Sequence, residues 1–288
     1  MRIILKNTAL VLSVLALLEG CSAQQMAVRL AYPLVDGQYR SLNEESDPDL
    51  ARQAIPANLK MMEGMLKSDE NNAALMDRLA EGFCGYAFGF VEDDDPRRAS
   101  ALYLRGRDYA LRSLAAYPGV AALPDLEREE YKTALQKIDS VPSLFWLAQC
   151  WAGWLNLNLD KPEALAQVSK LEAAIQRAAE LDETYHYAGP HLLLGSFYGG
   201  RTRLLGGDPE KARFHFERNL ELNHNKFLLA YVLYARTYAV QTQDRDLFER
   251  LLRNALETPS GVLPEQRLAN ETAKIKADKL MGRVDELF

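Results

Sequence analysis

The sequence predicts an all-α protein, an α-solenoid of paired antiparallel helices, and three observations lead to that prediction. Ala, Leu, Arg and Glu dominate the chain, and these residues are good helix formers. Val and Ile rarely cluster after residue 35, so runs typical of β-strands are scarce. Helix starts of similar form recur along the chain, and this recurrence indicates repeated helix pairs.

The first twenty residues have the pattern of a signal peptide. Arg2 and Lys6 precede an apolar run of about ten residues, whereas a helix that spans a bilayer needs about 20. The run ends at Leu18-Glu19-Gly20-Cys21, which resembles the lipobox of bacterial lipoproteins except at Glu19. We therefore predict that residues 1–20 are removed and that Cys21 becomes lipidated.

The residue after the cysteine indicates the destination of the protein, and a second interpretation of the segment remains. Ser22 follows the cysteine, and a serine there resembles the signal for sorting to the outer membrane, facing the periplasm. The alternative is an ordinary secretory peptide that is cut near residues 22–24, with Cys21 discarded.

Residues 21–45 are predicted to be a lipidated N-terminus and tether, followed by a helical-repeat domain over residues 46–288. Within the tether, residues 27–34 form a short helix or an extended segment that Pro33 interrupts, and Asp36-Gly37 is predicted to be a turn.

The helices that follow are expected at 48–68, 70–91, 96–117, 124–137, 142–157, 162–181, 187–200, 208–222, 225–241, 244–256 and 264–286. Asp and Pro mark several of their starts, because Asp accepts from free first-turn N–H groups and Pro is tolerated at the first helical position. These starts are Asp47-Pro48, Asp95-Pro96, Asp160-Lys161-Pro162, Asp208-Pro209 and Asp244.

Two stretches match the halves of a tetratricopeptide repeat. Leu194-Gly195-Ser196-Phe197-Tyr198 has the pattern of the first helix, and Ala212-Arg213-Phe214-His215-Phe216 has that of the second. We count four units, two of them cryptic. Residues 118–142 are then an insertion, and the glycines between 199 and 207 form a long turn between paired helices.

Two cysteines remain after Cys21, and both lie in apolar helical stretches. Cys84 and Cys150 are either two buried small hydrophobic residues or a disulfide between neighbouring helices, which the periplasm permits.

Charge and motifs narrow the classes of function. The formal net charge is −6, without basic clusters, which argues against a nucleic-acid partner. The four histidines lack the spacing of a helical metal pair, and we find no nucleophile elbow and no phosphate loop, so we predict no enzyme activity and no cofactor or metal. The acidic run 92–95 is expected to be a solvated loop, with a Ca²⁺ site as the alternative.

A glycine-rich aromatic helix is the best candidate for a binding wall. Gly82, Gly85 and Gly89 share one helical face, which predicts either close helix packing or the wall of a pore or groove. The expected apolar lining consists of Tyr86, Phe90, Trp146, Trp151, Trp154 and Tyr198.

Several stretches together resemble the TRAP transporter T component (TatT) family, which comprises periplasmic lipoproteins with tetratricopeptide-like repeats. They are residues 81–93, 101–111, 148–154, 189–200, 206–212 and 233–236. The resemblance covers most of residues 45–260. It implies a tetratricopeptide-like fold, a homotrimer with a ligand pore through each subunit, and association with the periplasmic substrate-binding component of a TRAP transporter.

The expected function combines the anchor with this resemblance. We expect a lipid-anchored periplasmic scaffold that docks the substrate-binding protein and assists transfer of a small organic or hydrophobic ligand. The alternative is a generic envelope assembly or peptide-binding lipoprotein, because helical repeats alone indicate only a binding scaffold.

Overall fold

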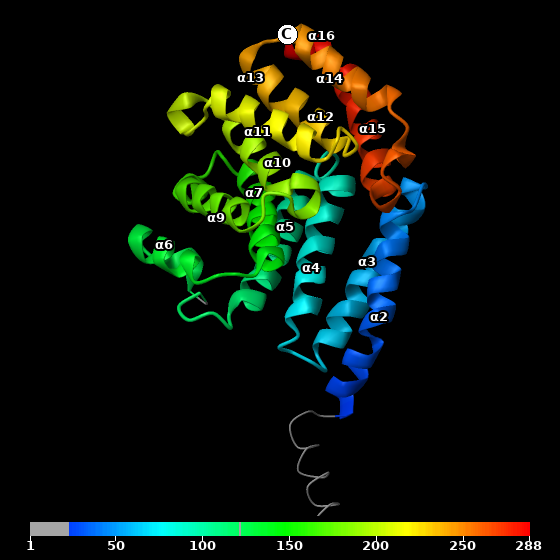
Figure 1. Cartoon of the computed structure of the whole chain (residues 1–288), viewed down its shortest axis with the longest axis vertical. Helices are drawn as coiled ribbons and strands as arrows, with labels where there is room; N and C mark the ends of the chain where they lie inside the picture. Colours follow the sequence, from blue (N-terminus) through cyan, green and yellow to red (C-terminus); the bar gives the residue numbers. More distant parts are fainter. Residues whose placement is uncertain (1–22, 121) are drawn as a thin grey trace, which may run out of the picture.

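The computed structural model describes residues 23–120 and 122–288, and the described residues contain helices, turns and loops but no strand. The predicted all-α class is therefore confirmed (Figure 1). The predicted signal peptide and Cys21 lie outside the described residues. The α-helices are α2 (Ala23–Asn43), α3 (Pro48–Leu66), α4 (Ala73–Tyr86), α5 (Pro96–Leu114), α6 (Arg128–Gln136), α7 (Val141–Asn156), α8 (Pro162–Leu165), α9 (Val168–Leu181), α10 (Tyr185–Gly199), α11 (Pro209–Leu222), α12 (Leu229–Tyr234), α13 (Val240–Thr242), α14 (Arg245–Glu257), α15 (Arg267–Met281) and α16 (Val284–Leu287).

Most of the Asp-marked helix starts behave as expected. The carboxylates of Asp47, Asp95, Asp208 and Asp244 each accept a hydrogen bond from a first-turn backbone N–H. Asp160 does not, because α8 begins at Pro162 and Lys161 therefore occupies the capping position. The helix expected at 162–181 is accordingly divided into α8 and α9.

The expected tether is a helix over most of its length. α2 runs through Pro33 and through the expected turn at residues 36–37, so the prediction of a turn there was wrong. Packing explains the difference, because Val28 and Val35 are buried against the rest of the protein. An ion pair of 3.1 Å between Arg29 Nε and Asp69 Oδ2 adds to the attachment.

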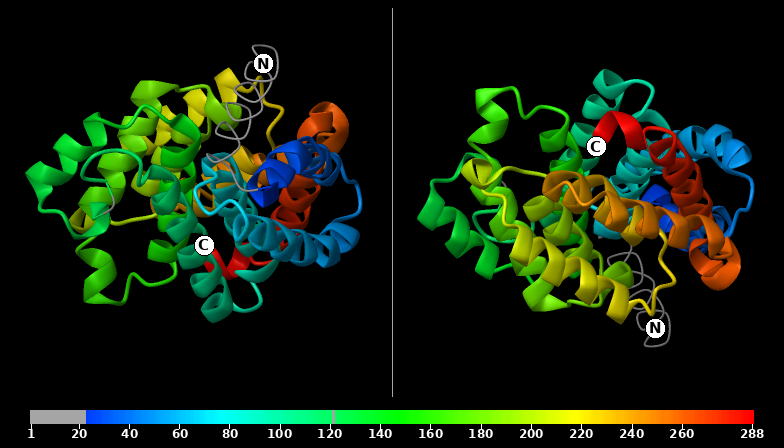
Figure 2. Two further views of the ribbon diagram at one scale, coloured as in Figure 1. Left: turned by 90° about the horizontal axis from the view of Figure 1, so that it is seen from below. Right: turned by 90° about the horizontal axis from the view of Figure 1, so that it is seen from above.

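The helices form a ring rather than an open row. α5 packs against α4 and α7, α10 against α11, and α12 against α14. The last long helix, α15, then returns to contact both α2 and α3 at the start of the chain (Figures 1 and 2). An ion pair of 2.8 Å joins Lys276 Nζ on α15 to Asp93 Oδ2, across 183 residues of sequence.

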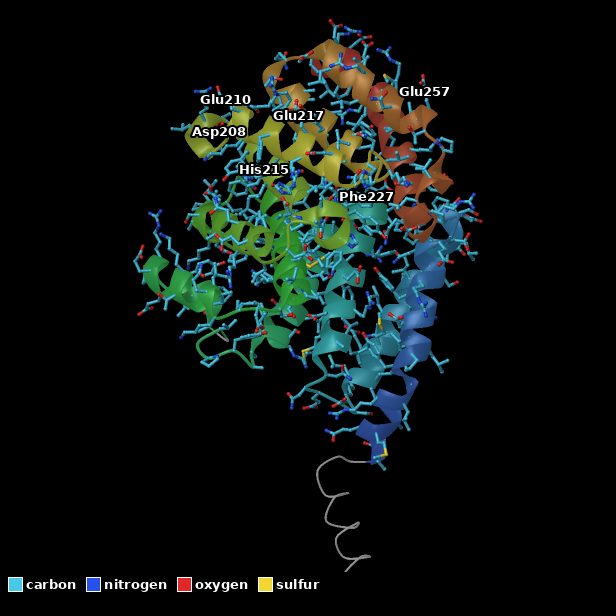
Figure 3. The ribbon with its side chains drawn as sticks, in the orientation of Figure 1. Asp208, Glu210, His215, Glu217, Phe227 and Glu257 are labelled. Atoms are coloured by element: carbon cyan, nitrogen blue, oxygen red, sulfur yellow. A yellow bond between two sulfur atoms is a disulfide. The ribbon has the colours of Figure 1, made fainter. Side chains whose placement is uncertain are left out.

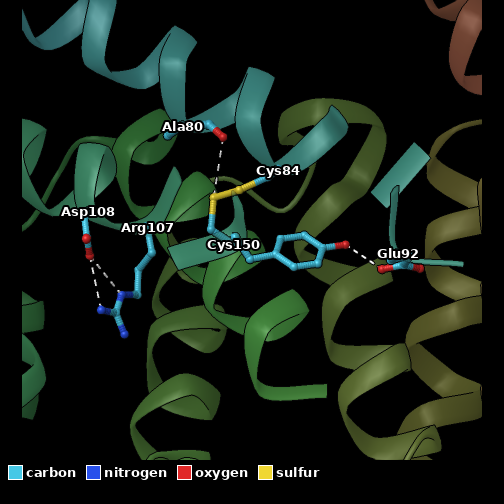
Figure 4. Close-up of a disulfide and its surroundings, with 7 residues drawn as sticks. Ala80, Cys84, Glu92, Arg107, Asp108 and Cys150 are labelled. Atoms are coloured by element: carbon cyan, nitrogen blue, oxygen red, sulfur yellow. Dashed lines mark hydrogen bonds and ion pairs between the residues drawn. A yellow bond between two sulfur atoms is a disulfide. The ribbon is translucent and has the colours of Figure 1, made fainter. Parts of the chain in front are cut away.

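A disulfide joins the two helices that flank α5. Cys84 on α4 and Cys150 on α7 are bonded, with their Cα atoms 5.3 Å apart (Figure 4). Gly106 on α5 lies against the bridge, where a Cβ atom would come within 2.7 Å and 2.8 Å of the two sulfurs. Of the two alternatives for these cysteines, the disulfide is the one that the structure contains.

Candidate ligand cavity

A cavity of about 570 Å³ that is partly open to solvent lies inside the ring. Its wall comes from α2, α3, α4, α7, α10, α12 and α15, so distant parts of the sequence meet there. The volume is within the range of sites that hold small organic molecules. The closing contact of α15 with α2 and α3 completes the wall.

Three of the six aromatic residues expected in the lining are found there. Tyr86, Phe90 and Trp146 line the cavity, and the rings of Tyr86 and Phe90 lie 5.9 Å apart. Phe145 and Phe227 add to the same apolar lining (Phe227 is labelled in Figure 3). A ligand role for these residues stays a prediction.

The other three aromatic residues lie elsewhere. Trp151 is fully buried, and its Nε1 donates to Gln167 Oε1 at 2.8 Å. Trp154 lies beneath the Arg107 guanidinium, 6.0 Å from the ring centroid. Tyr198 donates to Glu172 on α9, whereas its neighbour Phe197 lines the cavity.

Small residues on α4 determine how close the neighbouring parts approach. A Cβ atom at Gly82 would collide with Leu59 of α3, so this glycine allows close helix packing. A Cβ atom at Gly85 would meet nothing within 4 Å, and Gly85 lines the cavity. Close helix packing is thus found at Gly82, and both Gly82 and Gly85 lie in the wall of the cavity, whereas a role of this wall in ligand binding stays a prediction.

Two π-helical segments also contribute to the lining. Ala87–Val91 continues α4, and Ala235–Ala239 continues α12. Phe88 and Phe90 from the first segment and Arg236 and Thr237 from the second line the cavity. Single turns of π-helix inside α-helices are frequent at functional sites.

Ionisable side chains in the wall are mostly paired. Arg78 Nη1 lies 2.9 Å from Glu81 Oε2, and Tyr39 Oη donates to the other oxygen of Glu81. Burial raises the pKa of Glu81 despite the attraction of Arg78, and burial also raises that of Tyr39. Arg78 further lies 3.9 Å above the Tyr39 ring, so this cluster fastens α2 to α4.

The acidic run 92–95 is a turn that leads into α5, with Asp93, Asp94 and Asp95 exposed as expected, and Glu92 and Asp93 also take part in an ion-pair network. Glu92 accepts from Tyr103 Oη at 2.6 Å and from Arg236 Nη1 at 3.0 Å. Lys276 lies 3.7 Å from Glu92 and 2.8 Å from Asp93. Only the Glu92 carboxylate is thus withdrawn from water, whereas Asp93 and Asp94 make their ion pairs at the surface. Within the described residues, no group of three or more His, Cys, Asp or Glu side chains could hold a metal ion.

A left-handed turn places a histidine at the cavity. His186, Tyr187 and Ala188 have φ values of 46°, 60° and 57°, a conformation that costs energy for residues other than glycine. His186 lines the cavity, and its ring lies 4.9 Å from that of Trp146. Burial lowers the pKa of His186 to about 4, so the ring is neutral at pH 7.

A pair of histidines lies between α10 and α11, and neither of its rings lines the cavity. His191 Nδ1 lies 2.8 Å from His215 Nδ1, and His191 Nε2 lies 2.9 Å from Glu183 Oε2 (His215 is labelled in Figure 3). Arg218 also pairs with Glu183, at 2.8 Å. Hydrogen bonds to Arg218 and His191 lower the pKa of Glu183 to about 2, so its carboxylate is ionised at pH 7. This cluster joins two helices, and its residues are not part of the cavity lining.

Fold and cavity together define an all-helical protein whose helices surround a chamber of small-molecule size. Within the described residues, no helix is both long and apolar enough to cross a membrane. Comparison with known families gives the class a name. Residues 44–288 match the family TRAP transporter T-component, and the chain belongs to that family.

Membership associates the protein with a TRAP transporter and with the cell envelope, in a family of transporter components that is not a known enzyme family. The chain is also similar to an uncharacterized protein of Treponema pallidum (strain Nichols). The two are 25% identical over an alignment of 313 positions, which covers 94% of each chain.

Proposed function

We propose that this protein is a lipid-anchored periplasmic scaffold of a TRAP transporter that holds a small organic ligand and docks the substrate-binding protein. The cavity of about 570 Å³ is the observation that carries the proposal. Its apolar walls favour a ligand with a substantial hydrocarbon part, and its polar groups limit how such a ligand is oriented.

Two glycines allow a direct test of ligand binding in the cavity. Among the described residues, the buried hydrophobic core lies between residues 28 and 277, and a chain that begins at residue 22 retains all of these. Gly85→Leu in this chain adds a side chain that projects into the cavity, and we expect it to abolish binding of small amphiphiles in native mass spectrometry and calorimetry. Gly64→Leu is the matched control, because Gly64 on α3 also has open space at its Cβ but does not line the cavity. Equal binding by both variants would refute the cavity as the ligand site.

Docking of the substrate-binding protein is tested with that partner in purified form. Membership of the T-component family supports the proposal. We expect a complex at micromolar concentrations when the periplasmic substrate-binding protein of the cognate TRAP transporter is mixed with the chain that begins at residue 22. A solute-binding protein from an unrelated transporter is the control. If both proteins are folded and the cognate pair fails to associate, the scaffold proposal fails.

The anchor and the assembly belong to the same proposal. The apolar run and the lipobox-like sequence that ends at Cys21 support lipidation. Cys21→Ala should lose labelling by radioactive palmitate and should leave the membrane fraction, and membrane attachment without lipid would contradict the proposed anchor. Tetratricopeptide-like pairing of the helices and a homotrimer are further parts of the proposal, and native mass spectrometry will show whether the mass is three times that of one chain.

A further inference from the structure

One cation in the cavity wall differs from the others in the described residues. Arg78 pairs with Glu81, and Arg236 pairs with Glu92. Arg201 also lines the cavity but has no carboxylate within ion-pair distance among the described residues. Burial of a cation without a counter-ion is costly, so such a residue calls for an explanation.

The Arg201 side chain is buried and only partly satisfied. It is 4% exposed, Nη1 donates to the carbonyl of Phe197 at 2.7 Å, and Nη2 donates to Asn156 Oδ1 at 3.1 Å. Both acceptors are neutral, and Nε has no hydrogen-bond partner. Burial lowers the pKa of Arg201 to about 10, with a small opposing effect of Glu172, so the guanidinium remains charged at pH 7.

A second unsatisfied polar group belongs to the residue before Phe197, the carbonyl of which accepts from Arg201. Ser196, on α10, lines the cavity, and its Oγ is buried without a hydrogen-bond partner. A serine hydroxyl and a guanidinium Nε are both donors that suit one oxyanion. Arg201 also caps the C-terminus of α10 through its hydrogen bond to the Phe197 carbonyl. That structural role leaves Arg201 Nε and Ser196 Oγ unused.

The backbone around Arg201 is held in place by glycines. A Cβ atom at Gly207 would overlap the backbone carbonyl of Arg201, and one at Gly200 would come within 2.9 Å of the Ser196 carbonyl. The backbone N–H of Gly207 donates to the Thr202 carbonyl at 2.9 Å, which folds the loop back on itself. The loop therefore fixes the position from which the Arg201 side chain enters the wall.

We propose that Arg201 and Ser196 form an anion subsite at this end of the cavity, which takes the monoanionic head of an amphiphile, a carboxylate or sulfonate. The hydrocarbon part of the ligand then lies against the apolar lining near Trp146 and Phe197. One unpaired positive charge matches one negative charge, since the other cations of the wall already have carboxylate partners. This inference rests on the proposed function, in which the cavity holds a small organic ligand.

The test compares ligands that differ only in the head group. Calorimetry on the chain that begins at residue 22 uses octanoate, 1-octanesulfonate and 1-octanol. The wild-type protein should bind octanoate at least about tenfold more tightly than 1-octanol, because charge-assisted hydrogen bonds to a buried head are strong. Arg201→Gln should remove this preference and leave the affinity for 1-octanol within about twofold of the wild-type value. The two anions together show whether the subsite distinguishes a carboxylate from a sulfonate.

Control variants separate this role from stability. Arg203→Gln removes the same charge from an exposed residue two positions away and should leave the preference intact. Arg201→Lys, which keeps the charge, should retain part of the preference, and Ser196→Ala should weaken the affinity for octanoate more than that for 1-octanol. These two variants test the subsite if Arg201→Gln does not fold.

Equal loss of affinity for octanoate and 1-octanol in these variants, or an octanoate preference that survives Arg201→Gln, would overturn the subsite. If 1-octanol binds the wild-type protein and octanoate has no advantage, the subsite fails while the cavity proposal stands. If none of the three ligands binds, both fail.

Discussion

Loss of the Cys84–Cys150 disulfide gives a measurable test of how the helical ring is stabilised. The bond closes a loop between residues 66 positions apart. Loop-closure entropy in the unfolded chain predicts that Cys84→Ala/Cys150→Ala lowers the free energy of unfolding by about 4 kcal/mol at 25 °C. Urea unfolding followed by circular dichroism measures the change, and the m-value should rise because the unfolded chain becomes more extended. Wild-type protein unfolded with dithiothreitol present is the control and should behave like the double variant.

Gly106 provides an independent check of the same reasoning. Gly106→Ala places a Cβ atom 2.7 Å and 2.8 Å from the two sulfurs, and overpacking of this kind costs about 1–3 kcal/mol. With both sulfurs removed, the same substitution should cost at least about 1 kcal/mol less, which a double-mutant cycle measures. The reasoning is refuted if the disulfide variant keeps the wild-type stability, or if Gly106→Ala has the same cost in both backgrounds.

Three further predictions concern the wall of the cavity and the closure of the ring. Gly85→Ala should raise the free energy of unfolding by about 0.5–1 kcal/mol, because the Cβ meets open space and alanine favours the helix; Gly64→Ala should do the same, and a loss at Gly85 alone would contradict this. Burial lowers the pKa of His186 to about 4 in the folded protein, so between pH 6.5 and pH 4 the unfolded chain binds a proton that the folded protein does not. The free energy of unfolding should therefore fall by about 3 kcal/mol through this group as the pH is lowered over that range. His186→Asn, which suits a left-handed backbone, should lessen this fall when urea unfolding is measured at each pH. Lys276→Ala should lower the free energy of unfolding by about 3 kcal/mol and speed amide hydrogen exchange in α15, whereas Lys279→Ala, at an exposed ion pair, should change the free energy by less than about 1 kcal/mol.

Local signals in the sequence predict most of the helices but not the full length of α2, for which a short helix over residues 27–34 was one of two alternatives. The Asp-Pro starts are effective because capping depends on a few neighbouring residues. The full length of α2 was missed because Pro33 and Gly37 disfavour a helix locally, and its stability comes from burial of Val28 and Val35 against distant residues. The ion pairs of Glu92 and Asp93 could not be predicted for a similar reason, since their partner Lys276 is far away in the sequence.

The aromatic lining could be predicted only in part. α7 is buried on nearly every side, so the sequence does not distinguish Trp146, which faces the cavity, from Trp151, which faces α9 and α6. The signal at Arg201 was available but not used. An arginine that directly follows Gly199-Gly200 at the end of an apolar helix is placed where its side chain can fold back into the core.

The return of α15 to α2 and α3 has a consequence for how members with this architecture can change. An open stack of helix pairs gains or loses units at its ends with little effect on the rest. In a closed ring, an added pair would separate the first and last helices and remove one side of the chamber. Chain length is therefore tied to chamber size, and adaptation to a different ligand would come from substitutions along the wall, such as those at Gly85, and not from a change in the number of helices.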